Sequence, residues 1–271
     1  MSQRWADALG EWAIPPRILD AATRDPWMLP VARFAGRADR AVAEPSGASF
    51  ERAAEVLRNE AGSVLDVGAG AGAASLPLAS MATRLTAVDG HRSMLDAFAE
   101  RADRLGVEHQ EIEGRWPDVA LDVPVHEVTV VHHVVFNVAD IAPFMVALDR
   151  TSARRVVLEL PPHHPLSWLN PLWKKFHDLD RPVSPIAGDL VEILGAMGAA
   201  DLEADYWQLQ DPATADGSDD EDLAERAAVV AQRLCLPVER ESDVAQALAD
   251  VDPSYHRDVV TISWTPGSLR G

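Results

Sequence analysis

Short apolar runs separated by polar, helix-forming segments recur along most of the chain. The runs predict strands at residues 63–67, 84–88, 107–112, 125–131, 154–160, 202–209 and 259–264. Segments with apolar residues three or four positions apart predict helices at 93–105, 141–149, 190–197, 223–234 and 242–249. Strands that alternate with helices are typical of a parallel sheet covered on both faces. We therefore expect an α/β, Rossmann-like fold with a seven-stranded, mostly parallel sheet.

Three regions lie outside this alternation. Residues 1–60 show no strand pattern, and apolar spacing predicts a helix at 50–59, so this part is expected to form an N-terminal helical cap. The Rossmann-like domain is expected at 61–271. Two segments within it, 161–185 and 211–255, are expected to be insertions that form a pocket or lid, and the second is helical and precedes the last strand.

Composition places the chain among ordinary globular proteins, with 47% hydrophobic and 25% charged residues. No apolar run approaches the roughly 20 residues that a membrane helix needs, and the first residues lack the layout of a signal peptide. Cys235 is the single cysteine, which excludes an internal disulfide. These features predict a cytoplasmic protein without a membrane partner.

The charge of the chain argues against one class of partner. Forty-three acidic residues against 24 basic ones give a net charge of −19. A surface this negative repels a phosphate backbone over a Debye length of about 8 Å at physiological salt. Nucleic acid is therefore not an expected substrate.

The sequence SVLDVGAGAGAASLP, residues 63–77, carries the clearest chemical signal. An apolar strand leads into alternate glycines at 68, 70 and 72, and an Ala/Leu-rich helix is expected next. Glycines allow a turn that a Cβ would forbid, and the first amides of a following helix offer donors to a negative group. The pattern predicts a ligand-binding turn.

Two ligand classes use such a turn. Gly68, Gly70 and Ala73 also satisfy the dinucleotide pattern G-x-G-x-x-G/A, so a nicotinamide or flavin cofactor is one interpretation. Asp66 favours another, because a carboxylate two residues before the first glycine is unfavourable beside a pyrophosphate. It is well placed to pair with the amino group of an amino-acid-like ligand. Asp89, at the end of the next strand, is predicted by both interpretations as a ribose acceptor.

The phrases LDVGAGAG and VDGHRSMLDAFAERA resemble the first two motifs of class I S-adenosylmethionine-dependent methyltransferases. The resemblance covers residues 60–165. It implies S-adenosylmethionine as the cofactor, and it assigns roles residue by residue. The methionyl part would be held by Asp66, Gly68, Ala69, Gly70 and Gly72, the ribose by Asp89 and Gly90, and the adenine would lie near Met94.

The turn after the third strand departs from that family. It contacts adenine in the resembling enzymes, usually through an acidic residue, whereas this chain has Gly114, Arg115 and Trp116 there. Trp116 can stack on a base. His132, at the end of the fourth strand, is expected to meet the cofactor through its backbone.

Four of the nine histidines fall in two pairs at strand ends, His132-His133 and His163-His164. Ligands in open α/β sheets bind beyond the carboxyl ends of the strands. His133 and His163 are the candidate general bases, and Glu159 is a candidate to orient one of these rings. Adjacent residues of a strand point to opposite faces, so at most one of each pair is expected to face the pocket. No carboxylate has a spacing that predicts a metal site.

Residues 166–182, LSWLNPLWKKFHDLDRP, concentrate aromatic side chains after the fifth strand. One interpretation is a wall of the substrate pocket, and the other is a packing helix.

The expected function is methyl transfer from S-adenosylmethionine to an O, N or C centre of a small molecule. The alternatives are a non-catalytic cofactor-binding regulator and an NAD(P)-dependent oxidoreductase. A nucleic-acid methyltransferase is disfavoured by charge and by His132-His133-Val134-Val135, which stands where an Asn/Asp-Pro-Pro-aromatic motif would be. A homodimer contact is one role open to the second insertion.

Overall fold

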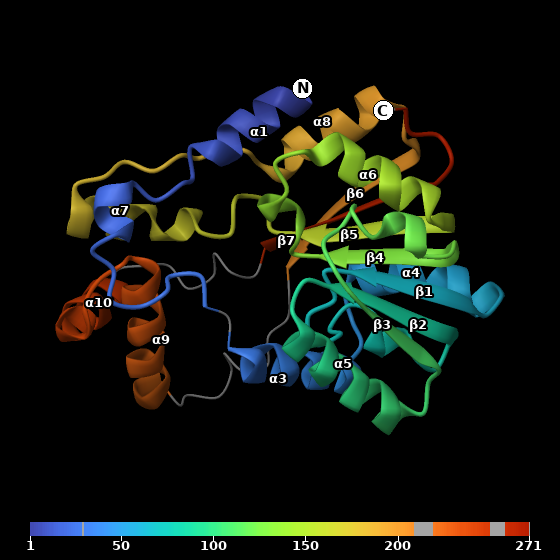
Figure 1. Cartoon of the computed structure of the whole chain (residues 1–271), viewed down its shortest axis with the longest axis horizontal. Helices are drawn as coiled ribbons and strands as arrows, with labels where there is room; N and C mark the ends of the chain where they lie inside the picture. The colour runs from blue at the N-terminus through green and yellow to red at the C-terminus, as the bar shows by residue number, and fades with distance from the viewer. Residues whose placement is uncertain (29, 209–218, 250–257, 271) are drawn as a thin grey trace.

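The computed structural model describes residues 1–28, 30–208, 219–249 and 258–270. A seven-stranded sheet runs through the molecule in the order β3-β2-β1-β4-β5-β7-β6 (Figure 1). Strands β1 to β5 pair in parallel, and β7 is antiparallel to both β5 and β6. The expected fold class is confirmed. The strands are β1 Gly62–Val67, β2 Ala82–Asp89, β3 His109–Glu113, β4 His126–His132, β5 Ser152–Leu160, β6 Ala200–Gln208 and β7 Asp258–Thr265.

The order of the strands fixes where a ligand can bind. The chain builds β1, β2 and β3 outward in one direction and then returns to place β4 on the other side of β1. The strand order therefore reverses between β1 and β4. A crevice outside the carboxyl ends of the strands forms at such a switch point. The turns after β1, β2, β4 and β5 all lie at that edge.

Helices cover both faces of the sheet (Figure 1). One face carries a core contributed by α1, α6 and α8 together with the strands, and Trp5, Phe144 and Leu194 are buried in it. The other face carries α3, α4 and α5, with Ala38, Leu57 and Phe98 in its core. These helices are α1 Ser2–Gly10, α3 Val31–Ala43, α4 Ala48–Asn59, α5 Arg92–Leu105, α6 Ile141–Arg150 and α8 Ala187–Met197. No helix in the described ranges is long and apolar enough to cross a membrane.

The expectation of an α-helix directly after β1 is wrong. Residues 68–81 form turns with one short 3₁₀ helix, Leu76–Leu78. Gly72 has φ 94°, and a Cβ there would lie 2.5 Å from the Leu76 side chain and 2.7 Å from that of Phe98. The glycine spacing therefore produces a tightly folded loop rather than a helix start.

Helix α3 packs against this loop and against α5. Ala38 is fully buried there. Asp39 accepts hydrogen bonds from Arg101, at 2.8 Å, and from Arg104, at 3.1 Å, so one carboxylate bridges two guanidinium groups of α5. Part of the expected N-terminal cap is thus a layer of the sheet domain itself.

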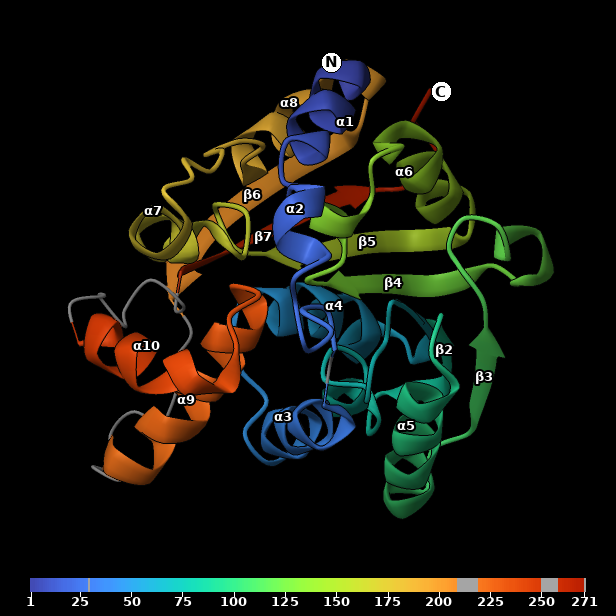
Figure 2. The ribbon, with the colours of Figure 1, turned by 60° about the vertical axis from the view of Figure 1, so that its left-hand side comes forward.

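A second, smaller hydrophobic core is carried by helices that lie beyond the carboxyl ends of the strands; Figure 2 shows these helices. It joins residues far apart in the sequence, since Ile14 and Ile18 pack with Trp173 and with Val230 and Leu248. Its helices are α2 Pro16–Leu19, α7 Asn170–His177, α9 Asp219–Arg233 and α10 Glu241–Leu248. The expected helical insertion before the last strand is confirmed. Residues 209–218 and 250–257 of that segment lie outside the described residues, and the domain boundary at residue 60 stays a prediction.

Candidate active site

The glycine turn carries the chain from the end of β1 across the end of β2. The backbone N–H groups of Gly68 and Ala69 both donate to the carbonyl of Val88, at 2.8 and 3.1 Å. Gly68 has φ 71°, and a Cβ there would lie 2.4 Å from a methyl group of Val134. Because Val134 directly follows the His132-His133 pair, the turn and the end of β4 are in direct contact.

Asp89 is held rigidly at the tip of β2. Its Oδ2 accepts the backbone N–H of Gly70 at 2.9 Å, and its Oδ1 accepts that of His91 at the same distance. The side chain is 12% exposed. Oδ1 also lies 3.2 Å from the Nδ1 of His91, so Oδ2, with one partner and two lone pairs, is the oxygen that retains capacity to accept a ligand hydroxyl. Gly90 follows with open space at its Cβ position, and Met94 is buried in the first turn of α5.

Asp66 is the least expected group at this edge, because it is a carboxyl group inside the sheet with an exposed fraction of 1%. Its Oδ2 accepts the Ser75 hydroxyl at 2.6 Å, whereas its Oδ1 is buried without a hydrogen-bond partner. Burial raises the pKa of Asp66 to about 7, against the hydrogen bond from Ser75. A buried acceptor without a donor is costly, so this position suits a ligand that brings a cationic or N–H group.

The turn after β3 lies beside Asp89. The N–H of Gly114 donates to the Asp89 carbonyl at 3.0 Å. Arg115 is exposed, whereas Trp116 is half-buried and its indole N–H donates to the carbonyl of Phe144 at 3.3 Å. The indole is therefore anchored to α6, and its role as a stacking surface stays a prediction.

Both histidines at the end of β4 approach one carboxylate. The Nδ1 of His132 lies 3.8 Å from Oε1 of Glu159, and the Nε2 of His133 lies 3.2 Å from the same oxygen. The expectation that at most one ring of this pair faces the pocket rests on strand alternation, which does not hold for His133. His133 lies beyond the strand with φ 58°, so strand alternation no longer sets the direction of its side chain.

The electrostatics of this cluster favour an ionised Glu159. Burial alone would raise the pKa of Glu159, but His132, His133 and a hydrogen bond from Ser49 outweigh it and hold that pKa well below its ordinary value. Burial lowers the pKa of His132 to about 4, and its Nε2 is buried without a partner. At neutral pH the cluster therefore holds a carboxylate beside a neutral His132.

The two members of the second histidine pair, His163 and His164, differ in burial. His163 is exposed, and its backbone bridges to Ile186. His164 is buried, its ring stacks on Trp12 at a centroid distance of 3.8 Å, and the edge of its ring meets Phe136 at 5.4 Å. Burial lowers the pKa of His164 to about 4. The ring that packs under the smaller core is thus that of His164.

Sequence patterns placed three contributors to this edge no more precisely than within the expected N-terminal cap. Ser49 hydrogen-bonds to Glu159 from 110 positions away, Trp12 stacks on His164, and Phe34 lies 3.5 Å from the Cβ position of Gly70. All three come from the first 60 residues. Of the aromatic segment, Trp173 is buried in the smaller core, as the packing interpretation expects, while Trp168 is half-buried at its border.

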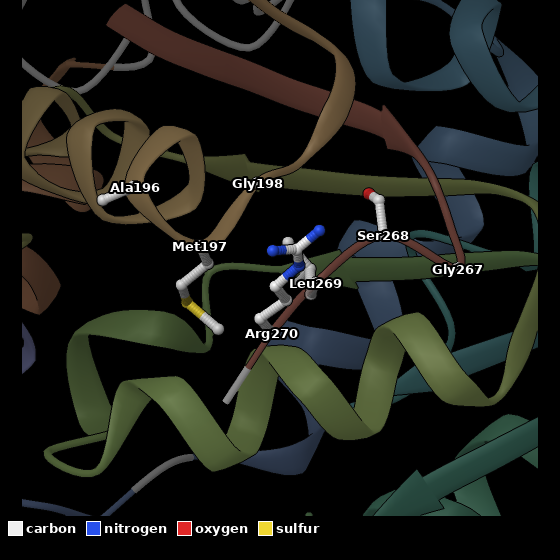
Figure 3. A pocket seen from close by; sticks show the side chains of 7 residues that line it. All are labelled: Ala196, Met197, Gly198, Gly267, Ser268, Leu269 and Arg270. Carbon is white, nitrogen blue, oxygen red and sulfur yellow. The ribbon is translucent and has the colours of Figure 1, made fainter.

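A hollow also lies at the opposite edge of the sheet. It measures about 440 Å³ between the end of α8 and the segment after β7, and Figure 3 shows its lining, Ala196 to Gly198 and Gly267 to Arg270. Arg270 is the one charged residue in that lining. A hollow of about 290 Å³, lined in part by Ser63, Arg84 and His126, lies at the amino ends of the strands. Glu108 also lines the second hollow, and both hollows lie away from the glycine turn. No cluster of three metal-ligating side chains occurs among the described residues.

Comparison with known proteins agrees with this geometry. Residues 64–154 match the family model described as a methyltransferase domain. Comparison with curated protein sequences finds none that is similar to this chain.

Three solved structures illustrate the similarity in fold. The YcgJ protein of Bacillus subtilis has a TM-score of 0.51 at 16% identity, over 80% of this chain and 98% of its own. Magnesium protoporphyrin IX methyltransferase of Synechocystis PCC 6803, solved with bound SAH, has a TM-score of 0.51 at 14% identity, over 97% and 95%. Coclaurine N-methyltransferase, bound to N-methylheliamine and SAH, has a TM-score of 0.52 at 14% identity, over 98% and 87%.

The seven-stranded sheet, with its glycine turn and ribose-type acid at the switch point, defines a Rossmann-like protein of the methyltransferase type. Residues 64–154 match a methyltransferase domain, and the chain shares its fold with the S-adenosylmethionine-dependent methyltransferases compared above. The nicotinamide interpretation of the glycine pattern is not supported.

Proposed function

We propose that this protein transfers a methyl group from S-adenosylmethionine to a small-molecule acceptor, with the cofactor at the ends of β1 and β2 and the acceptor at the ends of β4 and β5. The observation that carries the proposal is the unpartnered, buried Oδ1 of Asp66 beside the glycine turn. An α-amino group supplies the donor that this oxygen lacks.

The other cofactor contacts follow from the same edge. The backbone of Gly68, Ala69, Gly70 and Gly72 lines the methionyl part, and the fixed carboxylate of Asp89, followed by Gly90, accepts the ribose hydroxyls. Met94, Gly114, Arg115 and Trp116 surround the adenine, and the backbone of His132 faces the cofactor. When bound, S-adenosylmethionine supplies a methyl group already activated by its sulfonium.

The protein's part in the reaction is to orient the acceptor and accept its proton. The Nε2–H of His133 donates to Glu159, which leaves Nδ1 as the free proton acceptor. The carboxylate of Glu159 lies 3.2 Å from the same ring, so it holds the imidazole in place while Nδ1 receives the proton. His163 is exposed, so His133 is the better placed of the two candidate bases.

A small acceptor suits the region above these residues. The smaller core covers the carboxyl edge, and the aromatic rings of Trp12, Phe136 and His164 gather below it. A net charge of −19 disfavours a polyanionic substrate. The acceptor named for the Synechocystis enzyme, magnesium protoporphyrin IX, is likewise a small molecule.

Isothermal titration with S-adenosylhomocysteine tests the cofactor half of the proposal. The expected result is saturable binding by the wild type, strong weakening in Asp89→Ala, and no binding of NAD. Asp39→Asn is a matched control, because it removes a carboxylate charge from the α3–α5 contact rather than from the turn. Heat with NAD and none with S-adenosylhomocysteine would overturn the proposal.

A further inference from the structure

The two oxygens of Glu159 have different partners. Oε1 faces the two histidines, and Oε2 accepts a hydrogen bond from the hydroxyl of Ser49. Ser49 is 3% exposed and Glu159 is 6% exposed, so water does not compete freely for this contact. The hydrogen bond joins the second residue of α4 to the end of β5.

The position of Ser49 is itself fixed by β6 and β7. The indole of Trp207 packs directly on Gly47, where a Cβ would lie 2.1 Å from the ring, and Gly47 has φ 97°. The indole N–H donates to the Thr261 hydroxyl at 2.8 Å. Thr261 lies opposite Glu159 in the β5–β7 ladder. Residues directly opposite each other point to the same face of a sheet, so both side chains lie on the face that α4 covers.

A second contact holds the same helix one turn further on. Arg52 of α4 donates to Oδ2 of Asp205 from Nε, at 3.0 Å, and from its terminal nitrogen, at 2.9 Å. The position of Ser49 is thus determined by three contacts: the packing of Trp207 on Gly47, the hydrogen bond from Trp207 to Thr261, and the two hydrogen bonds from Arg52 to Asp205. A hydroxyl held in this way can determine the orientation of the group that it contacts.

We propose that Ser49 is a positioning residue for the methyl transfer reaction. By occupying Oε2, it stops the carboxylate of Glu159 from turning and keeps Oε1 directed at the Nε2–H of His133. The ring of His133 is then held with its Nδ1 as the proton acceptor. This inference rests on the proposed role of His133, and it assigns the start of α4 a part in the chemistry.

The test is the tautomer of His133, because the tautomer does not depend on knowing the acceptor. ¹⁵N spectra of histidine-labelled protein distinguish Nε2–H from Nδ1–H in the neutral ring. In the wild type the expected result is the Nε2–H form in about tenfold excess or more, since hydrogen bonds to charged groups are the strong ones. In Ser49→Ala the two tautomers of His133 are expected to approach equal populations, and Ser49→Thr, which retains the hydroxyl, is expected to restore the excess.

Ser152→Ala is the matched control. Ser152 is also buried and lies at the other end of β5, where its hydroxyl contacts the Leu148 carbonyl and the Thr129 hydroxyl rather than Glu159. Its removal is expected to leave the tautomer ratio of His133 unchanged. If Ser49→Ala does not fold, Ser49→Cys retains the size with a weaker donor, and an intermediate ratio is expected.

A wild-type tautomer ratio in Ser49→Ala, or in Ser49→Cys if that variant is used, would overturn the inference. So would an Nδ1–H ring in the wild type. S-adenosylhomocysteine binding, measured separately, is expected to stay within about threefold of wild type in Ser49→Ala, because Ser49 contacts neither Asp66 nor Asp89. Absence of binding in the wild type would contradict the proposed function while leaving the tautomer result intact.

Discussion

The proposed cofactor half and the proposed acceptor half of the site are built in different ways. The cofactor half comes from one continuous stretch, in which Asp66, the glycine turn and Asp89 lie within 24 residues and are joined by backbone hydrogen bonds. The acceptor half joins Ser49, His133 and Glu159, with Trp12 and His164 close by, from four separate parts of the chain. A cofactor common to many enzymes can be held by a local motif, whereas the acceptor pocket depends on tertiary packing.

The largest expected effect is the loss of the glycine turn. In Gly72→Ala, a left-handed backbone and a Cβ 2.5 Å from Leu76 act together, and the combined cost is about 2–5 kcal/mol of unfolding free energy. S-adenosylhomocysteine binding is expected to be lost with it. Denaturant unfolding and titration calorimetry measure the two effects.

The variant Gly267→Ala measures the cost of backbone strain alone, without steric crowding of the added Cβ. Gly267 has φ 95°, almost the same as Gly72, but nothing lies within 4 Å of its Cβ position. The expected cost is about 1–2 kcal/mol, with cofactor affinity unchanged. Equal costs at the two glycines would show that crowding in the turn contributes nothing.

The next effect concerns the acceptor half alone. His133→Ala is expected to lower kcat by about 10²- to 10⁴-fold, because a placed base is worth that much. The affinity for S-adenosylhomocysteine is expected to remain within about threefold. Radiolabelled methyl transfer to an acceptor found by screening gives the rate, and an unchanged kcat would remove His133 from the reaction.

The dependence of cofactor affinity on pH tests the cofactor half. Asp66 must be ionised to pair with an ammonium group, and its pKa in the free protein is raised to about 7 by burial. The affinity for S-adenosylhomocysteine is therefore expected to fall about tenfold per pH unit below 7, and to fall again above about 8 as the ligand's α-amino group loses its proton. In Asp66→Asn the fall in affinity below pH 7, the acidic limb of the pH profile, is expected to disappear. An acidic limb that persists in this variant would assign it to another group.

The raised pKa of Asp66 also makes the unfolding free energy depend on pH. This stability falls as pH rises, whereas the cofactor affinity rises with pH over the same interval. Because the folded pKa of Asp66 is raised, its proton stabilises the free protein fully below pH about 4, and this contribution falls as pH rises to about 7. The difference in unfolding free energy between wild type and Asp66→Asn is expected to change by about 4 kcal/mol over that interval. Denaturant unfolding at a series of pH values measures it, and a difference that does not vary with pH would contradict the shift.

The smallest effect is expected at the contact between the N-terminal segment and the 161–185 insertion. Arg181 donates to the carbonyls of Trp12 and Ala13 and lies over the rings of Trp12 and Trp173, at 5.5 and 5.1 Å. Arg181→Met is expected to cost about 1–2 kcal/mol and to speed amide exchange at residues 11–28, with little change in the glycine turn. Arg58→Met, which removes an exposed ion pair, is the control, and faster exchange throughout the sheet would show that the two halves are not independent.

The features that could be predicted from the sequence are those of the local cofactor motif and the strands, and the features that could not are those that depend on tertiary packing. All seven strands and the positions of Asp66 and Asp89 follow from local patterns, because apolar periodicity and glycine spacing act over a few residues. The missing helix after β1 was not predictable from propensity, since Gly72 has φ 94° and its Cβ position is closed in part by Phe98 of α5, which lies outside that stretch. The joint approach of His132 and His133 depends on one residue with φ 58°, and the Ser49 contact spans 110 positions. No local pattern encodes either of these features.

The central claim is that the buried carboxylate of Asp66 receives the amino group of the cofactor. A crystal structure of the complex with S-adenosylhomocysteine measures this directly. We expect the amino nitrogen to lie within about 3 Å of Oδ1 of Asp66, with both ribose hydroxyls on Asp89. An amino group elsewhere, with Oδ1 still lacking a donor, would contradict it.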